Sequence, residues 1–208
     1  SFLLIEMDRP GIEVRPIVSI DGEHHLNQVF FADLRVPRSN LVGQEGQGWE
    51  IAKYLLTHER TSIAGVAESK AAMANLLRSA AERRWAGTRL IDQPGMAARL
   101  ARAEIDLTAL EDTNLRVLSS TAAGKAPGPE SSLLKLMGTA VQQTLSELAL
   151  DIGAEQAWPW HPEGALAEAA HVHSMERYAF LRACTIYGGS DEVQKTVLAK
   201  SMLAGAAR

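Results

Sequence analysis

The sequence has little of what several classes of protein need. It contains one cysteine, Cys184, so it can form neither an internal disulfide nor a site built from several thiolates. Its uninterrupted apolar runs are a few residues long, whereas a membrane-spanning helix needs about 20. Lys and Arg form no cluster larger than short pairs, and the net charge is −4, which offers no basic patch to a phosphate backbone. We therefore expect a cytoplasmic protein without a nucleic-acid partner, a membrane span or a targeting segment.

The composition changes sharply along the chain. Residues 1–50 contain one alanine and residues 51–208 contain thirty-one. The first part alternates apolar and polar residues, which predicts strands, and the second repeats apolar residues at helical spacing. The pattern predicts strands over 1–8, 12–20 and 26–34, a hairpin turn at Asp21-Gly22, and helices over about 49–84, 95–119, 130–152, 166–185 and 191–204. We expect a mainly α fold, an antiparallel helical bundle preceded by a short antiparallel β segment.

Glu59 is the most unusual residue of the predicted 49–84 helix because it lies in line with an apolar stripe. Leu55 precedes it by four residues, and Ile63 and Val66 follow it by four and seven. A carboxylate on such a face loses hydration, which raises its proton affinity and suits a general base. The alternative is an ion pair with Arg60 or with a cation of another helix at the edge of the stripe.

A second candidate site lies where one helix ends and another begins. Residues Thr185–Ser190 read TIYGGS, and two adjacent glycines let a backbone pass close to a flat ligand. Ser190 is a natural N-cap, and the acidic residues Asp191 and Glu192 complement the helix dipole. Because those acids would repel a phosphate, a ligand there should present hydroxyls or a neutral ring. The alternative is an ordinary joint between helices.

Other features indicate structural roles. The glycines of residues 43–48 lack the order of a phosphate-binding loop. His171 and His173 are two residues apart on a predicted helix and face different directions, so we expect no metal site. Four large side chains are expected in the core or at a subunit interface: Met73, Trp85, Trp158 and Trp160.

Several segments together resemble the acyl-CoA dehydrogenase family. Residues 1–37 and 41–65 (LVGQEGQGWEIAKYLLTHERTSIAG) resemble the junction between the middle β domain and the C-terminal bundle, and residues 182–200 (RACTIYGGSDEVQKTVLAK) are similar to the C-terminal flavin-site segment. The resemblance covers nearly the whole chain. It implies the C-terminal half of such an enzyme, with residues 1–44 ending the middle domain and 45–208 forming the bundle.

Two further segments resemble one branch of the family. AGTRLIDQP at residues 86–94 and ALEDTNLRVL at residues 109–118 are similar to the bacterial branch in which two related subunits pair. That branch acts on dicarboxylyl-, long-chain or sterol-side-chain CoA thioesters. The resemblance thus implies an acyl-CoA substrate and a homo- or hetero-oligomer, a dimer or a tetramer.

The resemblance also implies a reaction, the FAD-dependent α,β-dehydrogenation of an acyl-CoA thioester to trans-2-enoyl-CoA. A carboxylate removes the α-proton while the β-hydrogen passes as hydride to the flavin, and an electron-transfer flavoprotein or a similar acceptor takes the electrons. Many members carry the base directly after Tyr187, where this chain has Gly188. A smaller set carries it on the first bundle helix just before an arginine, which matches Glu59 followed by Arg60. We therefore expect Glu59 as the base, with Arg60, Tyr187 and Gly188 near the substrate.

The expected FAD contacts come from two segments. Gly189, Ser190 and Glu192 belong to the C-terminal one. Arg83 and Arg84 stand where the family has an Arg-x-x-Phe-Gly run that reaches the FAD of a neighbouring subunit. The family's N-terminal domain and flavin-holding strands have no counterpart in this chain, so we expect the chain alone to be inactive. The alternative function is a non-catalytic helical assembly subunit or module.

Overall fold

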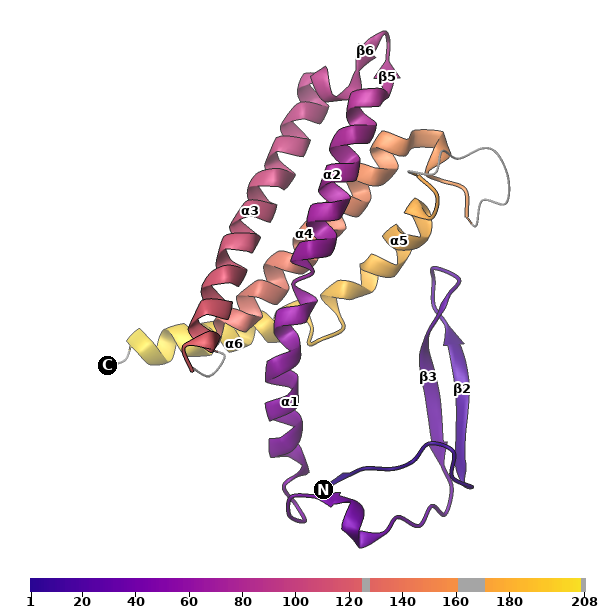
Figure 1. Cartoon of the computed structure of the whole chain (residues 1–208), viewed down its shortest axis with the longest axis vertical. Helices are drawn as coiled ribbons and strands as arrows, with labels where there is room; N and C mark the ends of the chain where they lie inside the picture. The colour runs from indigo at the N-terminus through magenta and orange to yellow at the C-terminus, as the bar shows by residue number, and fades with distance from the viewer. Residues whose placement is uncertain (125–127, 161–170, 207–208) are drawn as a thin grey trace. The chain divides into compact units, whose positions relative to one another are not determined.

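The computed structural model describes residues 1–124, 128–160 and 171–206, with the backbone alone for 57–63 and 205–206. The chain divides into two compact units, Ser1–His58 and Glu59–Arg208, drawn in Figure 1. Short antiparallel strands dominate the first unit and long helices the second. This arrangement confirms the predicted mainly α fold with a short β segment before it. The predicted domain boundary at 44/45 stays a prediction.

The first unit is built on a hairpin. Strands β2 (Ile12–Val18) and β3 (His24–Phe31) pair antiparallel, and Gly22 in the turn between them has a φ of 85°, so the predicted turn is confirmed. The predicted strand over 1–8 is wrong in extent. Only β1 (Phe2–Leu3) forms, because its partner β4 (Leu41–Val42) offers two residues for pairing. A short 3-10 helix, η1 (Arg38–Asn40), precedes β4.

The prediction of one helix over 49–84 is wrong, because two helices form there: α1 (Gly48–Ile63) and α2 (Val66–Glu82). Between them the backbone of Gly65 has a φ of 58°, a left-handed conformation that ends a helix. The neighbouring Ala64 is fully buried. It lies so close to Gly138 that a Cβ on that glycine would be 2.5 Å from the Ala64 carbonyl oxygen. A close backbone approach therefore accompanies the break.

The predicted fourth helix, 166–185, is also wrong in extent. In the described part it begins only at Ser174, ends at Leu181 and continues as a 3-10 turn, while 166–170 lie outside the described residues. The hairpin of β5 and β6 was not expected from the sequence. The remaining elements are β5 (Arg84–Trp85), β6 (Thr88–Arg89), η2 (Leu90–Asp92), α3 (Pro94–Ala122), α4 (Glu130–Gly153), η3 (Ala154–Gln156), α5 (Ser174–Leu181), η4 (Arg182–Thr185) and α6 (Asp191–Ala206).

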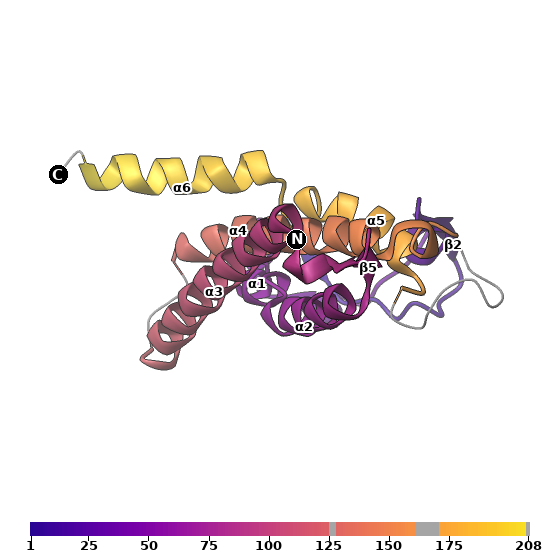
Figure 2. The ribbon, with the colours of Figure 1, turned by 90° about the horizontal axis from the view of Figure 1, so that it is seen from above.

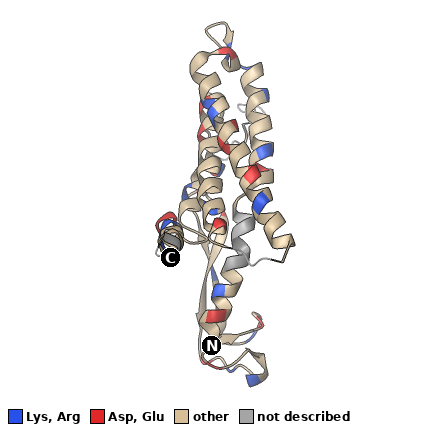
Figure 3. Cartoon of the chain, turned by 90° about the vertical axis from the view of Figure 1, so that its left-hand side faces the viewer, with Lys and Arg blue, Asp and Glu red and all other residues tan. Residues whose placement is uncertain are grey.

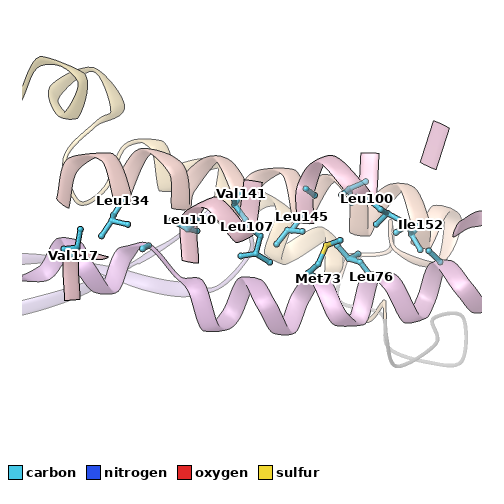
Figure 4. Close-up of a cluster of buried hydrophobic side chains, with 14 residues drawn as sticks. Met73, Leu76, Leu100, Leu107, Leu110, Val117, Leu134, Val141, Leu145 and Ile152 are labelled. Atoms are coloured by element: carbon cyan, nitrogen blue, oxygen red, sulfur yellow. The ribbon is translucent and has the colours of Figure 1, made fainter. Parts of the chain in front are cut away.

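Helix α4 is the central element of the helical unit, because it packs against α2, α3, α5 and α6. Figure 2 shows α6 running out beyond the bundle of α2, α3 and α4. The core lies among those three helices (Figure 4), where Leu110 and Leu134 have no exposed surface. Met73 is part of this core, as predicted. The buried residues of α3 recur at helical spacing, so one apolar stripe faces the core: Leu100, Ala103, Leu107, Leu110 and Val117.

The surface of the helical unit carries charges of both signs. Figure 3 shows the positions of basic and acidic residues interspersed along the helices. Two such residues pair across α2 and α3, where Lys70 Nζ lies 2.6 Å from Glu111 Oε1. Within the described ranges no helix is both long enough and apolar enough to cross a membrane.

Candidate active-site segment

The turn between η4 and α6, residues Tyr187–Ser190, is called the joint below. Its two glycines have left-handed backbones, with φ values of 67° for Gly188 and 88° for Gly189, which glycine adopts without steric cost. The hydroxyl of Ser190 accepts the N–H of Val193 at 3.4 Å, so Ser190 caps α6 as expected. The joint thus presents a stretch of backbone without side chains between Tyr187 and the helix start.

Gln194 holds the joint through hydrogen bonds to its backbone. Its side chain is 1% exposed, and its Nε2 donates to the carbonyl oxygens of Gly188 at 3.1 Å and Gly189 at 3.4 Å. A Cβ on Gly189 would lie 2.3 Å from that nitrogen, so only glycine allows this approach. Gln194 Oε1 is buried and has no hydrogen-bond partner among the described residues. The amide is therefore positioned by the two carbonyls of the joint.

A buried ion pair holds the start of α6. Lys135 of α4 has no exposed surface, and its Nζ donates to Asp191 Oδ1 at 2.7 Å. The Asp191 side chain is 22% exposed, so the pair connects the interior to the first turn of α6. The sequence analysis missed both Lys135 and Gln194. A lysine inside the apolar run LLKLM was the available signal for the first, because an ammonium is rarely buried without a partner.

Polar contacts also connect the end of α5 and the start of η4 to α4. Gln143 Nε2 donates to the Leu181 carbonyl at 3.0 Å. Arg182 donates through Nη2 to Ser146 Oγ at 2.9 Å and through Nη1 to Glu147 at 3.0 Å. Because these bonds run from the end of α5 to the middle of α4, they fix η4 just before the joint.

Two side chains at the joint have shifted proton affinities. Burial, and then the neighbouring Cys184, raise the pKa of Tyr187, whose ring centroid lies 6.2 Å from that of Phe180. Hydrogen bonds from its own backbone N–H and from the Ser190 hydroxyl lower the pKa of Glu192. Glu192 is therefore ionised at the positive end of the helix dipole, which disfavours an anion there.

The two arginines expected to contact FAD lie elsewhere. Arg83 Nη1 donates to Gln156 Oε1 at 2.8 Å, just beyond the end of α4. Arg84 Nη1 donates to the carbonyl of Gly87 within the β5–β6 hairpin. The hairpin tip exposes Trp85. Arg83 thus contacts η3, and Arg84 contacts the turn of the β5–β6 hairpin.

The joint and the arginines are far apart within one copy of the chain. The joint is tied to α4 at Lys135, and Arg83 is tied just past Gly153. Eighteen residues of α4 separate these two anchor points (153 − 135), about 27 Å at 1.5 Å per residue. The structure therefore brings together Tyr187, Gly188, Gly189, Ser190 and Glu192, and it leaves Arg83 and Arg84 apart from them.

Glu59 and Arg60 lie on α1, and their side chains fall outside the described part of the structure. The break at Gly65 corrects one step of the sequence argument, because Val66 starts a different helix and does not continue the stripe of α1. The role of Glu59 as a base stays a prediction.

The comparisons with known proteins agree on one family. Residues 46–203 match the family model described as "Acyl-CoA dehydrogenase, C-terminal domain". The chain is 34% identical over 205 residues to acyl-CoA dehydrogenase IpdE1 of Mycobacterium tuberculosis, covering 98% of this chain and 50% of that protein. It is 31% identical over 205 residues to acyl-CoA dehydrogenase FadE34 of the same organism, covering 98% of this chain and 26% of that one. The chain belongs to the acyl-CoA dehydrogenase family.

Solved structures show the same fold. The ChsE4–ChsE5 complex of Mycobacterium tuberculosis matches with a TM-score of 0.83 at 26% identity, over 97% of this chain and 52% of that one. A chain described as a Tcur3481–Tcur3483 steroid ACAD variant matches with a TM-score of 0.85 at 21% identity, over 97% and 51%. The chain thus spans about half the length of these relatives and of IpdE1.

Proposed function

We propose that the chain forms the C-terminal half of an FAD-dependent acyl-CoA dehydrogenase that converts an acyl-CoA thioester to the trans-2-enoyl-CoA. The observation that carries this proposal is the family match over residues 46–203, which includes both Glu59 and the joint. IpdE1 and FadE34, matched over 98% of this chain, are named acyl-CoA dehydrogenases.

Glu59 is the proposed general base, which removes the α-proton of the thioester. The position that many family members use for the base is occupied here by Gly188, and a side chain at a φ of 67° costs about 1–2 kcal/mol. The chain therefore supplies its carboxylate from α1, with Arg60 and Tyr187 near the substrate. A positioned base of this kind contributes about 10²–10⁴-fold to a reaction rate.

The joint is the part of the FAD site that this chain offers. Its two glycines leave backbone accessible to a flat ring, and ionised Glu192 favours contact with hydroxyls over phosphate. Gly189, Ser190 and Glu192 would therefore hold a neutral portion of the cofactor, while Arg83 and Arg84 would serve the FAD of a neighbouring copy, since they lie about 27 Å away along α4. Bound FAD supplies the acceptor for the β-hydrogen.

An oligomer follows from the same proposal. Trp85, Trp158 and Trp160 were expected in the core or at a subunit interface. They are 70%, 63% and 42% exposed, which contradicts the first alternative, and we propose the second. Heteromeric assembly is favoured by the likeness to the ChsE4–ChsE5 complex, and an electron-transfer flavoprotein is the proposed acceptor. Light scattering that shows a strict monomer at micromolar concentrations would contradict the proposed oligomer.

The substrate class follows the branch that the sequence resembles. We propose a dicarboxylyl-, long-chain or sterol-side-chain CoA thioester, and the likeness to a steroid ACAD supports the last.

A second candidate function is a non-catalytic assembly subunit of a heteromeric enzyme, which the exposed indoles also favour. The purified complete protein distinguishes the two, because a catalytic subunit is yellow and an assembly subunit is colourless.

The test of the catalytic proposal is Glu59→Gln in the complete protein. The amide keeps the shape of the side chain and cannot accept the α-proton, so turnover should fall at least about 10²-fold while the flavin content stays the same. Glu50→Gln is the matched control, because Glu50 lies on the same helix, in its first turn, and should leave turnover unchanged. Turnover of Glu59→Gln within about threefold of the parent would exclude Glu59 as the base, because a positioned base contributes about 10²–10⁴-fold.

A further inference from the structure

Two polar side chains hold the joint, and burying each of them away from water costs free energy. Lys135 has no exposed surface and Gln194 has 1%. An ammonium loses its hydration when it is buried, and a buried amide oxygen without a partner loses its hydrogen bonds to water. Gln194 Oε1 has no partner in the described parts of the chain. Neither residue is therefore explained by stability alone.

The buried ion pair has a positional effect that an apolar pair would lack. Apolar residues of similar volume often replace a buried ion pair without loss of stability. The ion pair, however, fixes one geometry: Lys135 Nζ lies 2.7 Å from Asp191 Oδ1, and Asp191 is the first residue of α6. The pair therefore sets where α6 starts relative to α4.

Gln194 acts on the other side of the joint. Its Nε2 reaches the carbonyls of both Gly188 and Gly189, and two adjacent glycines are otherwise the most flexible dipeptide a chain can have. Because both carbonyls point to one buried amide, the turn has one shape before any ligand arrives. A preorganised backbone of this kind reduces the entropy lost on binding.

We propose that Lys135 and Gln194 are positioning residues for the reaction proposed above: Lys135 fixes the start of α6 through Asp191, Gln194 fixes the carbonyls of the two glycines, and together they give the joint a single backbone shape for its ligand. The inference rests on the proposed function for its purpose. The fixing of the joint itself is a property of this chain and can be measured without turnover.

Hydrogen exchange of the joint's amides in the complete protein is the first test. Lys135→Met and Gln194→Met keep the volume and remove the donors, so exchange within residues 187–191 should become about five- to tenfold faster, the effect of losing one hydrogen bond. Two variants of the same chemistry serve as controls. Lys70→Met removes the lysine of the α2–α3 ion pair, and Gln93→Met removes an amide that donates to the Trp85 carbonyl in the β5–β6 hairpin. Both should leave exchange at the joint unchanged.

The second test separates positioning from mere stability. In the complete protein, Gln194→Met and the double variant Lys135→Met with Asp191→Leu should lower kcat/KM about tenfold or more, since one hydrogen bond is worth on that order. Their melting temperatures should stay within the range that the control variants span. The double variant is used because Lys135→Met alone leaves Asp191 without its partner, which lowers stability by itself, and it should show the same fast exchange at the joint.

The outcomes distinguish this inference from the proposed function. Unchanged exchange at the joint in both variants would overturn the positioning role, whatever the enzyme does. A wild-type protein without flavin or turnover would overturn the proposed function, and the exchange comparison would still decide whether these residues fix the joint. Faster exchange with unchanged kcat/KM would also overturn the inference, because the shape of the joint would then not matter to the reaction.

Discussion

The two units of the chain differ in where their apolar residues lie. In the helical unit, the leucines of α3 and α4 that face the core are buried almost completely, with Leu110 and Leu134 at 0% exposure. In the hairpin of the first unit, residues of similar size are exposed on both strands, and Leu26 and Phe31 are 59% and 58% exposed. One unit thus has its own core, and the other has a paired backbone without one.

This difference indicates what each unit can do by itself. A two-stranded hairpin is marginally stable in water, and further strands or a helix are needed to cover it. Under the proposed function, those strands belong to the half of the enzyme that this chain does not span. The helical unit carries both the joint and the side chains that hold it, Lys135 and Gln194.

The largest expected effect concerns FAD binding by the chain alone. The joint is one wall of the proposed site, and binding that loses about half of its contacts still meets the full entropy cost of association. We expect the isolated chain to be colourless, to bind FAD several orders of magnitude more weakly than the complete enzyme, and not to oxidise acyl-CoA. Titration with FAD, followed by flavin fluorescence, checks this. A submicromolar dissociation constant would show that the chain carries the whole site.

Two leucine substitutions test the contrast in burial directly. Leu110→Ala removes a fully buried side chain from α3 and should lower the free energy of unfolding by about 2–5 kcal/mol. Leu26→Ala makes the same chemical change on the exposed face of β3 and should stay within about 0.5 kcal/mol. Urea unfolding of the chain measures both. Equal losses would mean that the hairpin has a core of its own.

A glycine substitution tests the break between α1 and α2. Gly65 has a φ of 58°, and an alanine there should cost about 1 kcal/mol, since left-handed backbone costs about 1–2 kcal/mol and the stiffer unfolded chain returns part of that. Gly95→Ala is the control, because an added Cβ there meets nothing and a helical alanine should stabilise by about 0.5–1 kcal/mol. Thermal unfolding should move in opposite directions for the two variants. If Gly65→Ala stabilises the protein instead, the two helices are one.

The smallest expected effect is the pH dependence that Tyr187 contributes. Burial raises its pKa in the folded protein above the ordinary value of about 10. Below the ordinary value the phenol is neutral in both states, and its contribution to stability is fully present. As the pH rises towards the raised pKa, the unfolded state loses the proton first, so that contribution is lost. The melting temperature of Tyr187→Phe should therefore fall less than that of the wild type across this range, and parallel curves would contradict the assignment.

The sequence predicted the elements whose signals are local. The hairpin turn at Asp21-Gly22, the two long helices of the bundle and the cap at Ser190 all follow from residues within a few positions of each other. The break at Gly65 was missed because a glycine is only a weak local signal of a helix end. The close approach that accompanies it joins Ala64 and Gly138, which are 74 residues apart (138 − 64).

The candidate site likewise combines residues with a local sequence signal and residues whose role depends on contacts between distant parts of the chain. Ser190 and the glycines of the joint were found from their own spacing, whereas Lys135 and Gln194 gain their importance only from contacts made in the fold. A lysine in an apolar run signals a buried charge, but the sequence does not say that Asp191 is its partner. The arginines of residues 83 and 84 were assigned by resemblance, and only the structure separates them from the joint.

The most direct test of the account is the anaerobic mixing of an acyl-CoA with the complete oxidised protein. The account predicts that the wild-type enzyme loses its flavin colour within the mixing experiment, that Glu50→Gln does the same, and that Glu59→Gln keeps both its flavin and its colour. Equal loss of colour in Glu59→Gln and in the wild type would contradict the proposal that α1 carries the base.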